Sequence, residues 1–171
     1  MVAGRRRRRK ESIFVAEKGR YVYAWPRPMV TADAAVFAFF DGRPHLLLIR
    51  RKRDPYKGRW ALPGGFVEIE EDLPAAVARE LQEETGLTGV PLEQLRTFGR
   101  PDRDPRGRTI TVAYIGIVEN GCDRVQAADD AEEVQWCDID SLPPMAFDHD
   151  EIARCAIERL RQTRVQGRRD Q

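Results

Sequence analysis

Three glutamates at neighbouring positions of one predicted helix are the clearest candidates for chemistry in this sequence. Glu80, Glu83 and Glu84 stand at positions i, i+3 and i+4, which brings their side chains together on one ridge of an α-helix. Like charges at this spacing repel one another, and partial burial strengthens the repulsion. The pattern therefore predicts that a positively charged group lies among the three carboxylates.

The available ligand atoms indicate what that positive group is. The segment 65–87 contains no Cys and no His, so its side chains offer a metal ion oxygen atoms only. Oxygen ligands select hard cations, and Mg²⁺ in particular is usually held by a few carboxylates together with substrate phosphates. We therefore predict Mg²⁺ as the cofactor, with Mn²⁺ as the alternative.

Basic segments flank the acidic helix on both sides. Residues 50–59 carry six basic side chains against one Asp, and residues 100–108 carry four against two. Guanidinium groups form paired hydrogen bonds with phosphate oxygens, so a ligand that combines a metal ion with phosphate suits this arrangement. The candidate substrate-binding arginines are Arg51, Arg53, Arg103 and Arg106.

The distribution of charge is more informative than the formal net charge, which is only +1 for 171 residues. Residues 65–87 hold seven carboxylates and one arginine, and residues 5–10 are six basic side chains in succession. The length suits one domain. We expect a disordered basic leader at 1–11, a single domain at 12–165 and a tail at 166–171. Nucleic-acid binding by the leader is the less favoured reading, because no aromatic residue is interleaved in it.

The sequence lacks the patterns of a membrane or secreted protein. Its longest mostly apolar run, 34–40, is far shorter than the roughly 18–20 residues that a membrane span needs. The basic run is not followed by the apolar core of a signal peptide. We therefore expect a cytoplasmic protein with no membrane partner.

The hydrophobic pattern predicts an α+β fold. Two hairpins are expected, one over 12–16 and 21–25 and one over 30–40 and 44–51, the second of which flanks the turn dipeptide Asp41-Gly42. Further strands are expected at 92–98, 109–118 and 133–138, and helices at 73–85 and about 148–164. Many strands with two helices indicate a mixed sheet with helices packed on its faces.

The ends of both helices carry stop and start signals. Asp72 suits the N-cap of the first helix, Pro74 is tolerated in its first turn, and Gly86 suits a left-handed cap at its end. Asp148 and Glu151 have the spacing of a capping box and predict the start of the second helix.

The segment that begins at Gly65 reads GFVEIEEDLPAAVARELQEETGL and resembles the Nudix box, G-x5-E-x7-R-E-U-x-E-E-x-G-U, in which U is apolar. Every fixed position of the box is matched, by Gly65, Glu71, Arg79, Glu80, Leu81, Glu83, Glu84, Gly86 and Leu87. So many constrained positions make a chance match improbable. By the order of strands and helices the resemblance covers about residues 25–165, and it implies an α/β/α sandwich with a mixed central sheet.

The resemblance implies metal-dependent hydrolysis of a nucleoside diphosphate that is linked to another group. It implies that Glu80, Glu83, Glu84 and the carbonyl of Gly65 bind the divalent ion. It also implies structural roles for Glu71, Arg79 and Gly86, with Arg79 as an ion-pair partner of box glutamates.

The general base is less determined by the resemblance than the metal ligands are. Nudix enzymes use either a glutamate of the box or an acidic residue in a loop that follows it. The later candidates are Asp129, Asp130, Glu132 and Glu133, of which we favour Glu133.

Two segments outside the box, 56–66 and 98–108, are similar to those of bacterial ADP-ribose pyrophosphatase-type members of the family. A proline about 15 residues past the box is typical of that group, and Pro101 lies 14 residues after Leu87. The similarity implies conversion of ADP-ribose to AMP and ribose 5-phosphate. In this reading Arg103 and Arg106 contact phosphate or ribose, and Tyr56 or Phe98 stacks on adenine.

The same resemblance leaves other functions open. Similar domains occur in ADP-ribose-sensing transcriptional repressors, although a winged-helix domain then follows and this chain has only one predicted helix after Pro144. A housecleaning pyrophosphatase that acts on nucleoside triphosphates is another alternative. The resemblance is also compatible with a homodimer whose interface includes the first hairpin.

Overall fold

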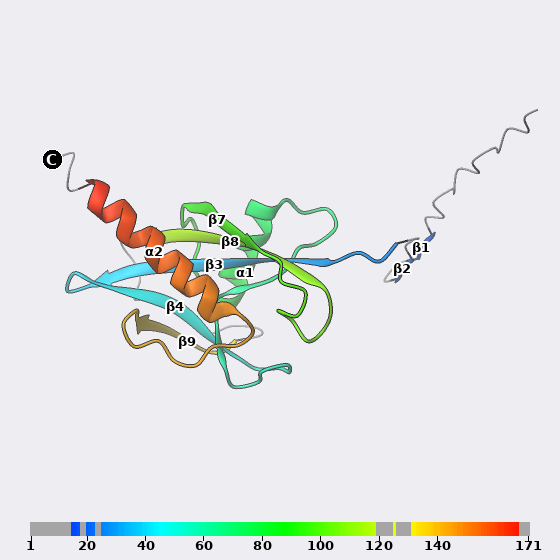
Figure 1. Ribbon diagram of the computed structural model, residues 1–171, viewed down its shortest axis with the longest axis horizontal. Helices are drawn as coiled ribbons and strands as arrows, with labels where there is room; N and C mark the ends of the chain where they lie inside the picture. Colours follow the sequence, from blue (N-terminus) through cyan, green and yellow to red (C-terminus); the bar gives the residue numbers. More distant parts are fainter. Residues whose placement is uncertain (1–14, 18–19, 23–24, 119–124, 126–130, 168–171) are drawn as a thin grey trace, which may run out of the picture.

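A computed structural model describes residues 15–17, 20–22, 25–118, 125 and 131–167 of the chain (Figure 1). The expected basic leader and the candidate bases Asp129 and Asp130 lie outside these residues. Within the described ranges, no helix has the length and apolar character needed to cross a membrane.

A seven-stranded mixed sheet forms the centre of the fold, and a separate two-stranded sheet precedes it. The small sheet pairs β1 (Val15–Glu17) with β2 (Arg20–Val22). The main sheet contains β3 (Met29–Phe40), β4 (Arg43–Arg51), β5 (Trp60–Ala61), β6 (Gly64–Phe66), β7 (Leu92–Phe98), β8 (Thr109–Val118) and β9 (Ala131–Asp138). Of its strand pairs only β3 and β8 are parallel, which makes the sheet mixed.

The two helices cover opposite faces of this sheet (Figure 1). Alternate residues of β3 divide between the faces, as the two-residue period of a strand requires. Ala35 and Phe37 pack in a cluster with Ile152 of α2 (His149–Gly167). Ala34 and Val36 pack in a second cluster with the apolar side chains of α1 (Leu73–Thr85). The α+β class and the α/β/α layering predicted from the sequence are thereby confirmed.

The candidate site lies where β3 and β4 diverge. These strands pair only near their hairpin, with Phe37 opposite Leu46 and Phe40 opposite Arg43. Farther along, β4 pairs with β5 and β9, and the edge of β3 is taken by β6 instead. The divergence opens the sheet between them and leaves room for a cavity that both strands line.

Helix α1 begins and ends at the residues that the sequence indicates. The Asp72 carboxylate accepts a hydrogen bond from the backbone N–H of Leu73 at 2.8 Å. Gly86 has the left-handed φ of 76° and donates its N–H to the carbonyl of Gln82 at 2.8 Å. These local contacts place Glu80, Glu83 and Glu84 on the ridge beside the sheet.

Two differences from the sequence prediction concern the site. Strands β5 and β6 were not predicted, because they are too short to show a periodic pattern of hydrophobic residues. Strand β6 nevertheless places Gly64 and Gly65 in the lining of the cavity. At the start of α2, the backbone carbonyl of Asp148 accepts the N–H groups of Glu151 and Ile152. The Asp148 carboxylate, which the capping-box spacing assigns to the helix, instead binds Arg103.

Candidate active site

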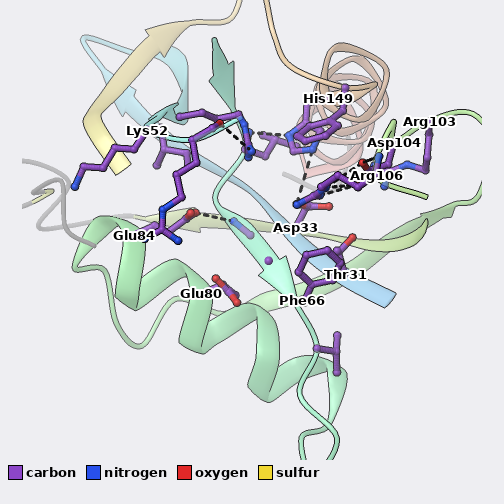
Figure 2. A pocket seen from close by; sticks show the side chains of 18 of the residues that line it. Thr31, Asp33, Lys52, Phe66, Glu80, Glu84, Arg103, Asp104, Arg106 and His149 are labelled. Carbon is purple, nitrogen blue, oxygen red and sulfur yellow. Dashed lines mark hydrogen bonds and ion pairs between the residues drawn. The ribbon is translucent and has the colours of Figure 1, made fainter. Parts of the chain in front are cut away.

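A cavity of about 510 Å³ lies between α1, the diverging strands and the start of α2 (Figure 2). Glu80 and Glu84 of α1 line one side of it, together with Gly64 and Gly65. Arg51, Lys52 and Arg53, at and just beyond the end of β4, also line it, as do Arg103 and Arg106 from the loop before β8. The structure thus brings the acidic ridge and both basic segments to a single cavity.

Glu84 is the most enclosed of the three ridge glutamates, with 7% of the residue exposed. Its Oε2 atom accepts a hydrogen bond from the backbone N–H of Gly64 at 2.9 Å. Burial, together with the nearby charges of Glu80 and Asp33, raises the pKa of Glu84 to about 8. The Gly64 N–H and the charge of Arg51 favour the ionised form but only partly offset this shift. A buried carboxylate with so little compensating charge is suited to a cation.

Glu80 and Gly65 lie against each other in the lining of the same cavity. A β-carbon at position 65 would collide with the Glu80 carboxyl group, so a larger residue there would have to displace this carboxylate. Burial raises the pKa of Glu80 in spite of the hydrogen bond that it accepts from Arg79. The close approach sets the Glu80 carboxylate beside the backbone of Gly65, as a shared ligand site requires.

Arg79 supplies positive charge within the acidic ridge. Its Nε and Nη2 atoms donate to the two oxygens of Glu71 at 2.8 and 2.9 Å. Its Nη1 atom donates to Glu80 at 2.8 Å and to Glu83 at 3.0 Å. Glu83 is accordingly turned toward Arg79 and is not among the residues that line the cavity. Arg79 therefore balances part of the acidic charge and holds the segment before α1 against the helix.

The oxygen ligands at the cavity are of the type that binds a hard divalent cation, but their positions only partly match such a site. Glu80, Glu84 and the backbone of Gly65 meet at the cavity and offer oxygen ligands alone. In the described part of the chain, however, no three acidic, His or Cys side chains converge closely enough to hold an ion. Glu83 would have to leave Arg79 to complete a three-carboxylate site.

On the basic side of the cavity, two guanidinium groups lie close to the ring of Phe147. The Cζ atoms of Arg51 and Arg106 lie 4.8 and 5.2 Å from the centre of the Phe147 ring. Arg51 also donates from Nε to the carbonyl of Pro55 at 3.0 Å. Stacking covers the face of a guanidinium and leaves its edge, where the N–H groups lie, oriented for phosphate.

Arg106 is held in place by a second ring and by a carboxylate. Its Cζ atom lies 4.8 Å from the centre of the Phe66 ring. Its Nη2 atom donates to Asp104 at 2.7 Å. Burial by itself would raise the pKa of Asp104, but the hydrogen bonds from Arg106 outweigh burial and lower it. The charge of Arg106 is therefore largely balanced before any ligand binds.

Arg103 has a different environment from the one expected of a substrate-binding arginine. Its Nε and Nη2 atoms donate to the two oxygens of Asp148 at 2.9 and 2.7 Å. Only 3% of the Arg103 side chain and 4% of the Asp148 side chain are exposed. Although Arg103 borders the cavity, its guanidinium is committed to this buried pair, which ties the loop before β8 to the start of α2.

Three other predicted residues lie outside the set that lines the cavity. Tyr56 packs edge-on against Phe147, with ring centres 4.9 Å apart. Phe98, the alternative stacking residue, is buried in the core under α2. Glu133, the favoured general base, is half-exposed on β9 and pairs with Arg50 at 3.4 Å. The structure therefore does not bring Glu133 together with the ridge glutamates.

The cavity also contains two residues that the sequence reasoning did not select, Asp33 and His149. Asp33 is the one charged residue within the buried apolar run of β3, and such an isolated charge was the available signal. His149 is one of only two histidines in the chain. Its Nδ1 atom accepts the backbone N–H of Leu62 at 3.0 Å, so the ring is neutral and carries its proton on Nε2.

This environment predicts an acid-sensitive contribution to stability. Burial lowers the pKa of His149 below its ordinary 6.5; of the charges around it, Arg103 and Arg51 also lower it, and Asp33 and Asp148 oppose the shift. As the pH falls through about 6.5, this histidine therefore binds a proton in the unfolded chain but not in the folded chain. The free energy of unfolding is therefore highest above that pH and decreases as the pH falls.

Denaturant unfolding at about pH 7.5 and about pH 5.5 measures the effect. In His149→Gln the loss between the two pH values should be smaller than in the wild type, by up to about 1.4 kcal/mol for each pH unit. His45→Gln, at the surface histidine whose Nδ1 contacts the Arg43 carbonyl, is the matched control and should follow the wild type. An unchanged pH dependence in His149→Gln would show that the buried ring titrates normally.

Comparison with known proteins identifies the family. Residues 29–160 match the model of the NUDIX domain, which covers most of the chain and includes the cavity just described. The chain belongs to the Nudix family.

Its relatives include both enzymes and a regulator. The chain is 47% identical over 120 residues to the ADP-ribose pyrophosphatase of Methanocaldococcus jannaschii, a match that covers 70% of each protein. It is 37% identical over 154 residues to the ADPR responsive transcriptional repressor NtrR of Acinetobacter baylyi, across 88% of this chain but only 60% of the repressor. Among solved structures, the NUDIX domain of Shewanella oneidensis NrtR complexed with ADP ribose is similar, with a TM-score of 0.74, 34% identity and coverage of 80% and 91% of the two chains.

Proposed function

We propose that the protein hydrolyses the diphosphate linkage of a nucleoside diphosphate derivative, with ADP-ribose as the substrate and AMP and ribose 5-phosphate as products. One observation carries the proposal: a single cavity combines the carboxylates of Glu80 and Glu84 with the basic side chains of Arg51, Lys52 and Arg53. A diphosphate bound to a cation needs both kinds of group at once. The 47% identity to an ADP-ribose pyrophosphatase supports this choice of substrate.

Glu80, Glu84 and the Gly65 carbonyl would hold Mg²⁺, or Mn²⁺ as the alternative, and Glu83 would join them after release from Arg79. When bound, such a cation neutralises charge on the leaving phosphate and lowers the pKa of an attacking water. The guanidinium of Arg51 binds phosphate oxygens while its face rests on Phe147. Glu133 could accept the water proton only after a movement of β9 toward the cavity. A ridge glutamate is better placed in this structure and is therefore the proposed base.

The second candidate is an ADP-ribose-binding module without turnover. It is favoured by one observation: Glu83 is paired with Arg79, and the described carboxylates do not converge on a common point. The similarity to a transcriptional repressor supports it as well, over the part of that protein that this chain matches.

A screen of nucleoside diphosphate derivatives and nucleoside triphosphates with product identification separates these functions. With Mg²⁺ we expect AMP and ribose 5-phosphate from ADP-ribose, and no products after chelation with EDTA. Tight binding of ADP-ribose by calorimetry without product would establish the sensing module instead. Preferential cleavage of nucleoside triphosphates would establish the housecleaning pyrophosphatase.

A further inference from the structure

Two polar atoms face each other in the cavity without forming a hydrogen bond. The Nε2 atom of His149 and the Oδ1 atom of Asp33 lie 4.0 Å apart, which exceeds hydrogen-bonding distance (Figure 2). Both side chains are more than nine-tenths buried, with 7% and 6% exposed. Both residues line the cavity.

The other polar atoms of these side chains are already occupied, which fixes what the facing atoms can do. The Nδ1 atom of His149 accepts the N–H of Leu62, so Nε2 carries the hydrogen and is a donor. The Oδ2 atom of Asp33 accepts the hydroxyl of Thr111, so Oδ1 is the acceptor that remains. In the described chain the two facing atoms have no hydrogen-bond partner, yet no fully enclosed side-chain nitrogen or oxygen lacks one. They must therefore be open to the cavity.

Glycine keeps the space beside this pair accessible. A β-carbon at position 64 would collide with Asp33 Oδ1 and with the backbone of β3. Gly64 also donates its N–H to Glu84, so the donor and acceptor pair lies close to the acidic ridge.

The separation of the two atoms suits one oxygen between them. If an oxygen lay about 2.9 Å from Nε2 and about 2.7 Å from Oδ1, the angle Nε2···O···Oδ1 at that oxygen would be about 90°. A hydroxyl can accept from Nε2–H and donate to Oδ1 simultaneously. A phosphate oxygen only accepts and would be repelled by Asp33, and an ammonium group only donates and would oppose Nε2–H.

We propose that His149 and Asp33 form a hydroxyl-binding subsite that recognises a sugar hydroxyl of the substrate. This inference rests on the proposed function, because it takes ADP-ribose as the ligand that enters the cavity. ADP-ribose has two sugars that carry hydroxyls, the ribose of adenosine and the terminal ribose. The subsite selects between ligands that possess and lack the hydroxyl, since loss of that group leaves a buried donor and a buried carboxylate oxygen unpaired.

Calorimetry in EDTA tests the subsite as equilibrium binding, without turnover. The ligands are ADP-ribose and analogues that each lack one hydroxyl, on either the adenosine ribose or the terminal ribose. In the wild type, one analogue should bind about ten- to a hundredfold more weakly than ADP-ribose. The sugar whose hydroxyl produces the loss is the one that occupies the subsite.

Variants of the pair should remove this discrimination. Asp33→Ala, which removes the acceptor while the Thr111 hydroxyl keeps the Thr31 carbonyl as a partner, should bind ADP-ribose and the critical analogue within about twofold of each other. His149→Phe should do the same. The matched controls are Asp102→Ala, at an exposed aspartate, and His45→Phe, at the other histidine, and both should discriminate as the wild type does.

Three results would overturn the proposal. Equal affinity of the wild type for ADP-ribose and every analogue would show that only water fills the site. Weaker binding of all ligands by the same factor in Asp33→Ala would show that Asp33 acts on the cavity in general. These two results leave the proposed function intact, as does failure of the wild type to bind any ligand in EDTA when ADP-ribose is still hydrolysed with Mg²⁺. Absence of both binding in EDTA and product formation with Mg²⁺ would end both proposals. If His149→Phe does not fold, the wild-type comparison and Asp33→Ala still decide the question.

Discussion

Glu84→Gln should lower kcat for ADP-ribose hydrolysis about a thousandfold. Glu84 is the most enclosed of the three ridge glutamates, and the amide of Gln can still accept the Gly64 N–H while it carries no charge. Loss of metal-assisted catalysis is worth several kcal/mol, and each 1.4 kcal/mol corresponds to a factor of about ten in rate. Steady-state kinetics with saturating Mg²⁺ measures the change.

Thermal unfolding distinguishes a lost ligand from a damaged fold. Because burial raises the pKa of Glu84 to about 8, the carboxylate is costly to ionise in the absence of metal, so Tm of the metal-free variant should equal or exceed that of the wild type. The increase of Tm on addition of Mg²⁺ should be lost. Glu158→Gln, on the exposed side of α2, is the matched control. A Glu84→Gln enzyme within a few-fold of wild-type activity would disprove the proposed ligand role.

Arg103→Leu should reduce the free energy of unfolding by about 3–5 kcal/mol. The substitution leaves the Asp148 carboxylate, of which only 4% is exposed, without its partner in the interior. The double variant Arg103→Leu with Asp148→Leu should recover most of this loss, because replacement of a whole buried ion pair by apolar side chains is often nearly neutral. Urea denaturation of the two single variants and the double variant measures the coupling.

The exposed pair of Arg100 and Asp102 is the control for this experiment. Both of its side chains are more than half exposed, so Arg100→Leu should change the free energy of unfolding by less than about 1 kcal/mol. If Arg103 binds the diphosphate as the sequence predicts, Arg103→Leu should instead raise KM strongly and leave stability nearly unchanged. The comparison of stability with KM therefore decides between the two roles of Arg103.

The sequence was most informative where contacts are short-range. The cap at Asp72, the termination at Gly86 and the ridge of glutamates all depend on residues within one or two turns of helix. The layering of the domain was also predictable, because β3 is apolar on both of its faces and the helices carry apolar stripes of characteristic period. The spacing of the Nudix box, finally, is a property of the residues alone.

For the basic side of the cavity, the sequence indicated which segments carry the arginines but not which arginines are available to a ligand. Four arginines were expected to bind substrate, yet Arg103 is paired with Asp148 and Arg106 with Asp104, so their charges are already balanced. Nothing in the segment 100–108 distinguishes these two arginines from Arg100, which is paired at the surface. The distinction comes from burial, which depends on how the loop packs against α2.

The amino-acid order alone was sufficient to define an acidic helix between basic segments, its Nudix spacing and the layers that support it. The folded chain was needed to bring Asp33 of β3 and His149 of α2 to either side of an opening beside Gly64. Those residues are far apart in sequence and obey no period, and their meeting depends on where β3 separates from β4. Long-range packing therefore decides which polar atoms remain accessible to a ligand. The spacing of residues along the sequence does not predict this accessibility.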